Sequence, residues 1–170
     1  MNIQRIVDTN EDLLTAVEES RKHEQYFVTK TFNGYPCAHR QWAHDGHCKF
    51  VHGYQRSFTI VFGCSSLQER TNFVVDFGDL DWVKEVLEGF FEHTLLIAED
   101  DPELDFFKEM HERGLCDLRV MPNPGMEYCA KLVYSIVNRG IQERTNGRAW
   151  VVSVECRENE KNAATYSPGV

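Results

Sequence analysis

The chain has 170 residues, of which 42% are hydrophobic and 12% aromatic, and its formal net charge is −9. This size and composition are ordinary for a single globular domain with its own hydrophobic core. The acidic balance excludes general electrostatic affinity for nucleic acid, because binding to a polyanion requires clustered Lys and Arg. No apolar run approaches the roughly 20 residues needed to cross a bilayer, which excludes the class of membrane-spanning helical proteins.

The start of the sequence lacks the basic region and continuous apolar core of a secretion signal. We therefore expect a cytoplasmic protein. Its six cysteines are expected to be thiols rather than disulfides, most of them buried in the core.

Residues 1–24 are predicted to form a polar, amphipathic helix ahead of the main domain. Thr9 or Asn10 can serve as its N-terminal cap. The apolar stripe of this helix consists of Leu13, Leu14 and Val17. Nothing in this extension points to a function, so we place the single domain at residues 25–166 and a short tail at 167–170.

Extended segments are predicted next. Alternating side chains from Gln25 to Asn33 predict a strand, Gly34-Tyr35-Pro36 breaks it, and a second extended piece runs from Cys37 to Trp42. The turn signal Asp45-Gly46 then leads to a strand from His52 to Phe62. The even positions of that strand share one face and are His52, Tyr54, Arg56, Phe58, Ile60 and Phe62. Its polar start is therefore expected at the end of the core or in a pocket.

The middle of the chain is predicted to add one strand and two helices. Phe73 to Phe77 is expected to form a hairpin with the preceding strand. Asp79 can cap a helix from Leu80 to Phe91. A second helix is predicted from Ala98 to about Arg113, and Gly114 ends it.

A helix and a strand close the predicted domain. Apolar residues recur at helical spacing from Met126 to the Asn138-Arg139-Gly140 region. Arg148 to Cys156 predicts the last strand, and the chain from Asn159 onward returns to a loop. We expect one strand face to hold Trp150, Val152, Val154 and Cys156, and the other to hold Ala149, Val151, Ser153 and Glu155. The order of elements predicts the α+β class, an antiparallel sheet with helices on one face.

Histidine and cysteine are concentrated between residues 37 and 54, which hold four of the seven histidines and two of the six cysteines. These side chains bind transition metals and move protons near neutral pH. His39 and His52 are the strongest zinc candidates, because both lie on strands that flank the turn holding His44 and His47. Histidines that are simply exposed or part of the core are the alternative.

Four further residues carry side chains suited to proton transfer or binding. Cys48 is a candidate base or nucleophile, with a small buried apolar residue as the alternative. The Glu92-His93 pair at a helix end can act as an oriented acid and base, or can reflect the preference of a helix C-terminus for a cation. Glu155 lies within a strand, where a carboxylate needs partners, and a pair of ligand N–H donors would satisfy it.

Six short motifs follow one another along the chain. They are Ala38-His39-Arg40, Cys48-x-x-x-His52-Gly53, Val75-Asp76-Phe77-Gly78-Asp79-Leu80, Glu92-His93, Pro124-x-x-Glu127 and Val154-Glu155-Cys156. In this order and context they resemble the 6-pyruvoyl- and 6-carboxytetrahydropterin synthases. Each motif is short, but six in the right order argue against a chance match. The resemblance covers the domain predicted at residues 25–166.

The resemblance implies a tunnelling fold (T-fold), an antiparallel four-stranded sheet with helices packed on one face. It also implies a homo-oligomer, a hexamer in the family, with active sites between subunits. The implied activity is that of a lyase that converts a small-molecule pterin, 7,8-dihydroneopterin triphosphate, to 6-carboxytetrahydropterin for 7-deazaguanine (queuosine-type) biosynthesis. The alternatives are a family member with a different product (6-pyruvoyl or aldolase-type) and a non-catalytic pterin-binding protein with a degraded metal site.

The resemblance also assigns roles by motif position. His39 and His52 match ligands of a Zn²⁺ cofactor. Cys48 matches the catalytic cysteine, and His93 matches its proton-relay partner. Glu92 stands where the family usually has Asp.

Substrate contacts are implied for two carboxylates. Glu155 matches the residue that binds the ring N–H and amino group of the pterin, and Glu127 matches a second substrate-binding position. Contacts to the phosphates are expected from among Lys49, Arg40 and Arg56.

The chain departs from the family pattern at the metal site. The usual His-Gly-His reads His52-Gly53-Tyr54 here, so the usual third zinc ligand is absent. His47 is favoured as the replacement because it directly precedes Cys48. The alternatives are His44, Tyr54 through its oxygen, or a site that binds zinc weakly or not at all. The segment from Thr94 to Val120 is longer than the family typically carries and is expected to add a helix near the site.

Overall fold

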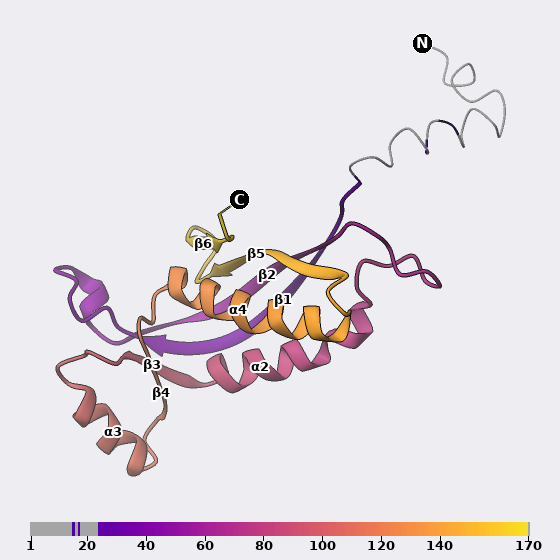
Figure 1. Cartoon of the computed structure of the whole chain (residues 1–170). Coiled ribbons are helices and arrows are strands. Elements are labelled where there is room, and N and C mark those ends of the chain that lie inside the picture. Colours follow the sequence, from indigo (N-terminus) through magenta and orange to yellow (C-terminus); the bar gives the residue numbers. More distant parts are fainter. Residues whose placement is uncertain (1–14, 16, 18–23, 170) are drawn as a thin grey trace.

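The computed structural model describes residues 15, 17 and 24–169. Thr15 and Val17 are helical and Glu24 is not, while the other residues of the predicted N-terminal helix, its cap included, lie outside the described residues. Among the described residues, six strands form one sheet in the order β4-β3-β1-β2-β5-β6 (Figure 1). The strands are β1 (Tyr26–His39), β2 (His52–Cys64), β3 (Thr94–Ala98), β4 (Asp117–Met121), β5 (Ala149–Arg157) and β6 (Ala163–Tyr166). The helices are α2 (Asp81–Phe91), α3 (Leu104–Glu112) and α4 (Met126–Arg144), and the short 3-10 turns are η3 (His47–Lys49) and η4 (Phe77–Leu80).

β1 and β2 form the long antiparallel hairpin at the centre of the sheet, and the predicted kink in the first strand is confirmed. Their pairing shifts register between Phe32 and Tyr35, where Gly34 adopts the left-handed backbone region with φ of 95°. The shift reverses the side-chain alternation, so Phe32 before the kink and Tyr35, Cys37 and His39 after it are all buried. The kink therefore directs His39 to the side of the sheet that holds the core.

α2 and α4 cover one face of the sheet, as predicted (Figure 1). Phe58, Ile60 and Phe62 of β2 are fully buried in the core between the sheet and these helices. Burial of a large apolar side chain of this kind contributes about 1.5–3 kcal/mol. The helix stripes are Val83, Leu87 and Phe91 from α2, and Cys129, Ala130, Val133, Val137 and Ile141 from α4. Tyr54 continues the same face of β2 but is 38% exposed, so the helices leave this end of the face open.

The predicted strand at Phe73–Phe77 is wrong. Val74 and Val75 are buried, but this segment is bent and joins no ladder. Its carbonyl groups are satisfied differently, because the Arg148 guanidinium donates to the oxygens of Phe73 and Val74 at 3.3 and 2.8 Å. Asp76, rather than the predicted Asp79, accepts from the N–H of Gly78 and caps the turn that leads into α2.

Two strands that the sequence did not predict, β3 and β4, extend the sheet beyond β1. β3 pairs in parallel with β1 and with β4, so the sheet is mixed and has more than the four expected strands. The predicted helix is correspondingly shorter, beginning at Leu104 rather than Ala98. All five residues of β3 are buried because both of its faces are covered: Leu96 belongs to the main core, whereas Leu95 and Ile97 pack with Phe107 of α3.

β5 also differs from the prediction. A register shift against β2 leaves Val152 without a partner in the ladder, so Val151 before it and Val154 after it are both buried. The predicted division of Ala149–Cys156 into two strictly alternating faces is therefore wrong. The predicted terminal loop is also interrupted, because β6 pairs antiparallel with β5. No helix in the part of the chain that the structure describes is long and apolar enough to span a membrane.

Candidate functional site

His39 and His52 lie together at the end of the β1–β2 hairpin. They are direct partners in the antiparallel ladder, and their ring centroids are 4.4 Å apart. Tyr54 follows two residues after His52 on the same strand face, with its ring centroid 5.6 Å from that of His52 and 6.4 Å from that of His39. The structure therefore brings both predicted zinc ligands together, with the phenol of Tyr54 as their neighbour.

His39 is the buried member of the pair, with 3% of its surface exposed. Its Nε2 lies 3.2 Å from Oε1 of Glu158, while its Nδ1 is buried without a hydrogen-bond partner among the described residues. Burial lowers the pKa of His39 below its usual value, although the hydrogen bond with Glu158 acts in the opposite direction. A neutral imidazole that donates from Nε2 to Glu158 presents an unpartnered lone pair on Nδ1.

Glu158 in turn contacts Arg56, a cation with no exposed surface. The nearer guanidinium nitrogen of Arg56 is 3.7 Å from Oε1 of Glu158. Arg56 also donates to Sγ of Cys129 and to the carbonyl oxygen of Pro124, both at 2.8 Å. The hydrogen bond from His39, which outweighs burial, lowers the pKa of Glu158. The Glu158 carboxylate therefore lies between a histidine and a buried arginine.

Buried thiols surround this arginine. Cys37, Cys129 and Cys156 interact electrostatically with Arg56, and burial is the main cause that raises the pKa of each thiol, to about 11 for Cys37. These three cysteines are therefore protonated at neutral pH. All six cysteines are free in the structure, as predicted.

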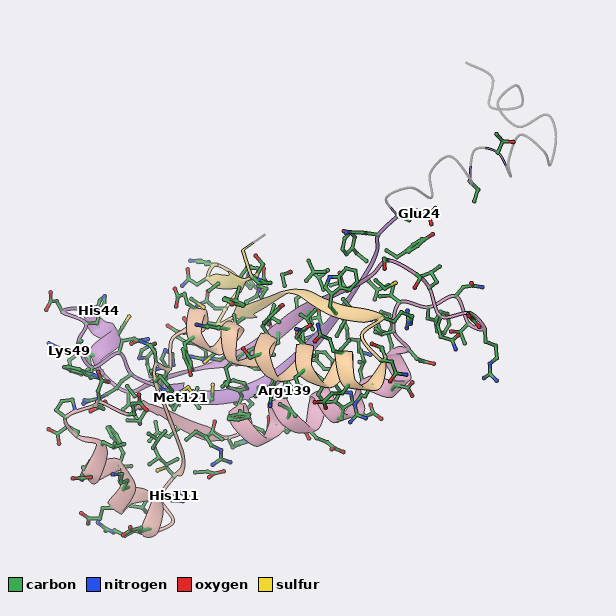
Figure 2. The ribbon with its side chains drawn as sticks, in the orientation of Figure 1. Glu24, His44, Lys49, His111, Met121 and Arg139 are labelled. Atoms are coloured by element: carbon green, nitrogen blue, oxygen red, sulfur yellow. The ribbon has the colours of Figure 1, made fainter. Side chains whose placement is uncertain are left out.

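Cys48 differs from the other cysteines because it is the exposed one. It lies in η3, within the loop of residues 40–50 that we call the Cys48 loop. The N–H of Gln41 donates to the carbonyl oxygen of Cys48 at 2.8 Å, which ties the two ends of the loop together. Figure 2 shows His44 and Lys49 on this loop, which projects past the end of the sheet.

The loop histidines do not join the histidine pair. His44 accepts a hydrogen bond at Nδ1 from the N–H of Gly46 at 2.8 Å, and His47 is exposed in η3. Across residues 24–169, no three His, Cys, Asp or Glu side chains are grouped so that they could hold a metal ion. The predicted set of His39, His52 and His47 is therefore not assembled, and the oxygen donors beside the pair are the Tyr54 phenol and the Glu158 carboxylate.

Glu92 and His93 form the predicted acid–imidazole pair at the end of α2. Nδ1 of His93 is 2.8 Å from Oε1 of Glu92, and the His93 side chain is 79% exposed. His93 adopts a left-handed backbone conformation with φ of 54°, fixed by its N–H donating to the carbonyl oxygen of Pro36 at 2.8 Å. A non-glycine residue held in this region costs about 1–3 kcal/mol and often marks a functional position. His93 and Tyr54 line the same open hollow of about 480 Å³.

The two predicted substrate carboxylates lie elsewhere. Glu155 accepts from Arg157 at 2.9 and 3.1 Å, and it lies on the sheet face opposite the buried Val154 and Cys156. Glu127 is exposed in the first turn of α4 and lines a separate hollow of about 400 Å³. The carboxylate beside the histidines is Glu158, which the sequence analysis missed because it lies in a polar stretch with no periodic pattern.

The candidate phosphate contacts are also separated by the structure. Arg56 is enclosed and Arg40 is paired with Asp101. Lys49 is exposed on the Cys48 loop, with its Nζ 5.5 Å from the centroid of the Phe50 ring. Lys49 is therefore the one of these three cations that is open to a ligand.

Similarity to known proteins agrees with this geometry. The family model of 6-pyruvoyl tetrahydropterin synthase matches residues 28–169. The 6-carboxy-5,6,7,8-tetrahydropterin synthases of Rickettsia felis and Rickettsia conorii are each 28% identical over 71 residues, which are 41% of this chain and 51% of each relative. The chain therefore matches about half the length of these curated relatives.

Solved structures share the fold at low sequence identity. An uncharacterised protein from Wolinella succinogenes has a TM-score of 0.74 at 20% identity, over 86% of this chain and 99% of that one. The 6-pyruvoyltetrahydropterin synthase of Plasmodium vivax has a TM-score of 0.60 at 15% identity, over 85% and 99%. That of Caenorhabditis elegans has a TM-score of 0.59 at 15% identity, over 86% and 97%. With the fold, the motif order and the family match in agreement, this chain belongs to the 6-pyruvoyl tetrahydropterin synthase family.

Proposed function

We propose that this protein is a lyase of the tetrahydropterin synthase type that converts 7,8-dihydroneopterin triphosphate to 6-carboxytetrahydropterin, a step toward 7-deazaguanines such as queuosine. The observation that carries the proposal is the pairing of His39 with His52 across the β1–β2 ladder, on the face that also holds Tyr54. Two imidazoles from paired strands, one with an unpartnered Nδ1, are a donor set suited to zinc. The names of the Rickettsia relatives favour the 6-carboxy product.

His39 and His52 are proposed to hold Zn²⁺, with Tyr54 as the third protein donor. His47, which the sequence favoured, is less suitable because it is exposed in η3 and is not grouped with the pair. When bound, zinc supplies Lewis-acid polarisation of the hydroxyl groups on the substrate side chain.

Proton transfer is assigned to His93 and Cys48. Oε1 of Glu92 holds Nδ1 of His93 at 2.8 Å, which leaves Nε2 free to exchange a proton with the substrate. The exposed thiol of Cys48 serves the opposite transfer, and its loop joins the strand that ends at His39 to the strand that begins at His52. Both side chains are open to solvent, so a bound pterin can reach them.

A carboxylate is needed to bind the N–H groups of the pterin. The sequence indicates Glu155, which lies on the sheet face opposite the buried Val154 and Cys156. The geometry favours Glu158, because it lies on the histidine side of the sheet and its lowered pKa keeps it ionised at neutral pH. Glu127 lines a separate hollow, so it can contribute a carboxylate only to the pterin site of a neighbouring subunit.

The site is proposed to be completed in a cytoplasmic homo-oligomer, a hexamer by family resemblance, with active sites between subunits. Phe50, Val51 and Tyr54 are 60%, 49% and 38% exposed beside the histidine pair. Apolar surface of this kind beside polar groups is typical of a face that is covered on assembly.

A second candidate function is a pterin-binding member of the family with a different product or without turnover. The observation that favours it is the replacement of the third histidine by Tyr54, together with the lack of a three-residue His, Cys, Asp or Glu metal set in residues 24–169.

Zinc content and turnover separate the two functions. The purified full chain should carry close to one zinc per subunit and form 6-carboxytetrahydropterin from 7,8-dihydroneopterin triphosphate. A protein that binds pterin, holds less than about a tenth of a zinc per subunit and yields no product would support the second function and overturn the first.

A further inference from the structure

Three consecutive residues follow His39, and they bind either the segment β3–α3–β4, which extends the sheet beyond β1, or the loop after β4. Nε of Arg40 donates to Oδ2 of Asp101 at 2.7 Å, and a second guanidinium nitrogen donates to Oδ1. Nε2 of Gln41 donates to Oδ1 of Asn123 at 3.0 Å. Nε1 of Trp42 donates to Oδ1 of Asp100 at 3.1 Å.

Asp101 is the most deeply held of these partners. It is 5% exposed, and its carboxylate also accepts from the backbone N–H of Glu103 at 2.8 Å. The Arg40 guanidinium lies over the ring of Phe107 in α3, 5.3 Å from its centroid. A bidentate arginine–carboxylate pair fixes both direction and distance, so the end of β1 is held against the turn before α3 in one geometry.

Further hydrogen bonds connect this end of β1 to the Cys48 loop. Gln41 lies between Arg40 and Trp42, and its N–H holds the carbonyl oxygen of Cys48 at 2.8 Å. The carbonyl oxygen of Gln41 accepts from the N–H of His44 at 2.9 Å. Figure 1 shows the loop around η3 and the β3–α3–β4 segment at the same end of the sheet. The backbone group that anchors Cys48 therefore belongs to Gln41, and both neighbours of Gln41 are held by the added segment.

We propose that Asp101 is a positioning residue, through which the β3–α3–β4 segment sets the Cys48 loop for proton transfer. Asp101 acts through Arg40 and Gln41 and touches no substrate. The catalytic consequence rests on the proposed function, whereas the effect on the loop does not. Catalysis by a positioned group is sensitive to displacements of about 1 Å, which can cost about 100-fold in rate.

Asp101→Asn in the full chain tests the proposal, with Asp105→Asn as the matched control. Asp105 lies on α3 of the same segment, its side chain is 97% exposed, and it contacts only Lys108 among the ion pairs described. Amide hydrogen exchange should become at least about tenfold faster in a peptide covering residues 40–50 of Asp101→Asn. The reason is that loss of a charge-assisted pair lowers the free energy of local opening by a corresponding amount. Exchange in α4 should become faster only as far as the measured loss of unfolding free energy accounts for, whereas the loop should open locally and independently of that loss. Asp105→Asn should match the wild type throughout.

A kinetic measurement distinguishes positioning from support of the fold. For Asp101→Asn we expect kcat to fall about tenfold and KM for 7,8-dihydroneopterin triphosphate to change less than about twofold, because binding groups stay in place. Trp42→Phe keeps an aromatic side chain but removes the indole N–H that binds Asp100. It should cause a smaller rise in loop exchange and a smaller fall in kcat at an unchanged melting temperature.

Two results would overturn the positioning role. The first is loop exchange that equals the wild-type rate or that becomes faster only through global unfolding, at the same rate as exchange in α4. The second is faster loop exchange with an unchanged kcat in an active enzyme. If the wild type turns over no pterin, the proposed function fails, and the exchange of residues 40–50 alone decides whether Asp101 sets the loop.

Discussion

His39 and His52 face each other across the β1–β2 ladder, with ring centroids 4.4 Å apart. One imidazole is buried against Glu158, and the other is half-buried, with its Nδ1 2.7 Å from the carbonyl oxygen of Phe50. A kink in β1 and the pleat of β2 place both rings on one face of the sheet, so the pair follows from backbone register rather than from loop conformation. The predictions for metal binding depend on this pair.

Replacement of Tyr54 by histidine should strengthen zinc binding. Tyr54→His adds a third imidazole beside His39 and His52, so we expect zinc affinity to rise at least about tenfold, as measured by competition with a chromophoric chelator. Tyr54→Phe removes only the phenol oxygen and should lower the affinity. An unchanged affinity in Tyr54→Phe would rule out Tyr54 as a ligand.

Matched histidine variants test which imidazoles bind. His52→Ala should abolish zinc binding, because it removes one of two nitrogen donors. His44→Ala and His47→Ala change exposed residues of the Cys48 loop and should keep the wild-type zinc content. A loss of zinc in His47→Ala but not in His44→Ala would show that His47, the ligand that the sequence favoured, binds the metal.

Cys48→Ala should remove turnover while pterin binding persists. Loss of a group that transfers a proton costs about 10²–10⁴-fold in kcat, whereas the dissociation constant of the pterin, measured by fluorescence, should stay within about twofold. Cys116→Ala is the control, since this half-buried thiol precedes β4, away from the histidine pair. Full activity in Cys48→Ala would show that another group performs the transfer.

Glu158→Gln and Glu155→Gln separate the two candidate pterin carboxylates. We expect Glu158→Gln to weaken pterin binding about tenfold or more, because a charge-assisted contact on the histidine side is lost. Glu155→Gln should have little effect, since Glu155 lies on the other face of the sheet from the histidine pair. The reverse result would assign pterin binding to Glu155. Melting temperatures of both variants show whether either change acts by destabilising the fold.

The sequence predicted the parts of the fold that have a regular period or a strong turn signal. The kinked first strand, the helices α2 and α4, the end of α3 at Gly114 and the location of His39 and His52 on strands that flank one turn all follow such signals. β3 could not be identified in this way, because a strand covered on both faces shows no alternation. Phe73–Phe77 has the composition of a strand, but a distant guanidinium satisfies its carbonyl groups.

Long-range polar contacts account for the rest of the candidate site. Glu158 lies beside His39 because Arg56, a buried residue on β2, holds it there. The sequence around Arg56 and Glu158 does not indicate that these two residues are in contact. The sequence indicates Glu155 as a site residue because of its place in a strand, but the register shift at Val152 and the neighbouring Arg157 determine its surroundings.

The ion pair of Asp101 with Arg40 makes stability depend on pH. Burial raises the pKa of Asp101, but the hydrogen bonds from Arg40 and Glu103 and the charge of Arg40 outweigh it, so the pKa lies below the ordinary value of 3.8. A carboxyl with a lower pKa in the folded state contributes stability above the unfolded value, and this contribution is lost as the pH falls through the folded value.

Asp101→Asn should therefore lower the free energy of unfolding by about 2 kcal/mol at pH 7. The difference from the wild type should shrink below pH 3.8, when the wild-type carboxyl takes up a proton. Urea unfolding at a series of pH values measures this difference. A difference that stays constant down to the acid limit would mean that the variant acts through packing rather than charge.

Gly34 controls whether His39 reaches the core side of the sheet. Its φ of 95° is costly for a residue with a Cβ, and the register shift at this point reverses the alternation of β1. We expect Gly34→Ala to lower the free energy of unfolding by about 1–2 kcal/mol and to reduce zinc binding, because the kink and the position of His39 are coupled. Gly89→Ala is the control: Gly89 lies in α2 with no atom within 4 Å of an added Cβ, and alanine there should stabilise the protein by about 0.5–1 kcal/mol. Zinc binding that is unchanged in a destabilised Gly34→Ala protein would show that the position of His39 does not depend on this kink.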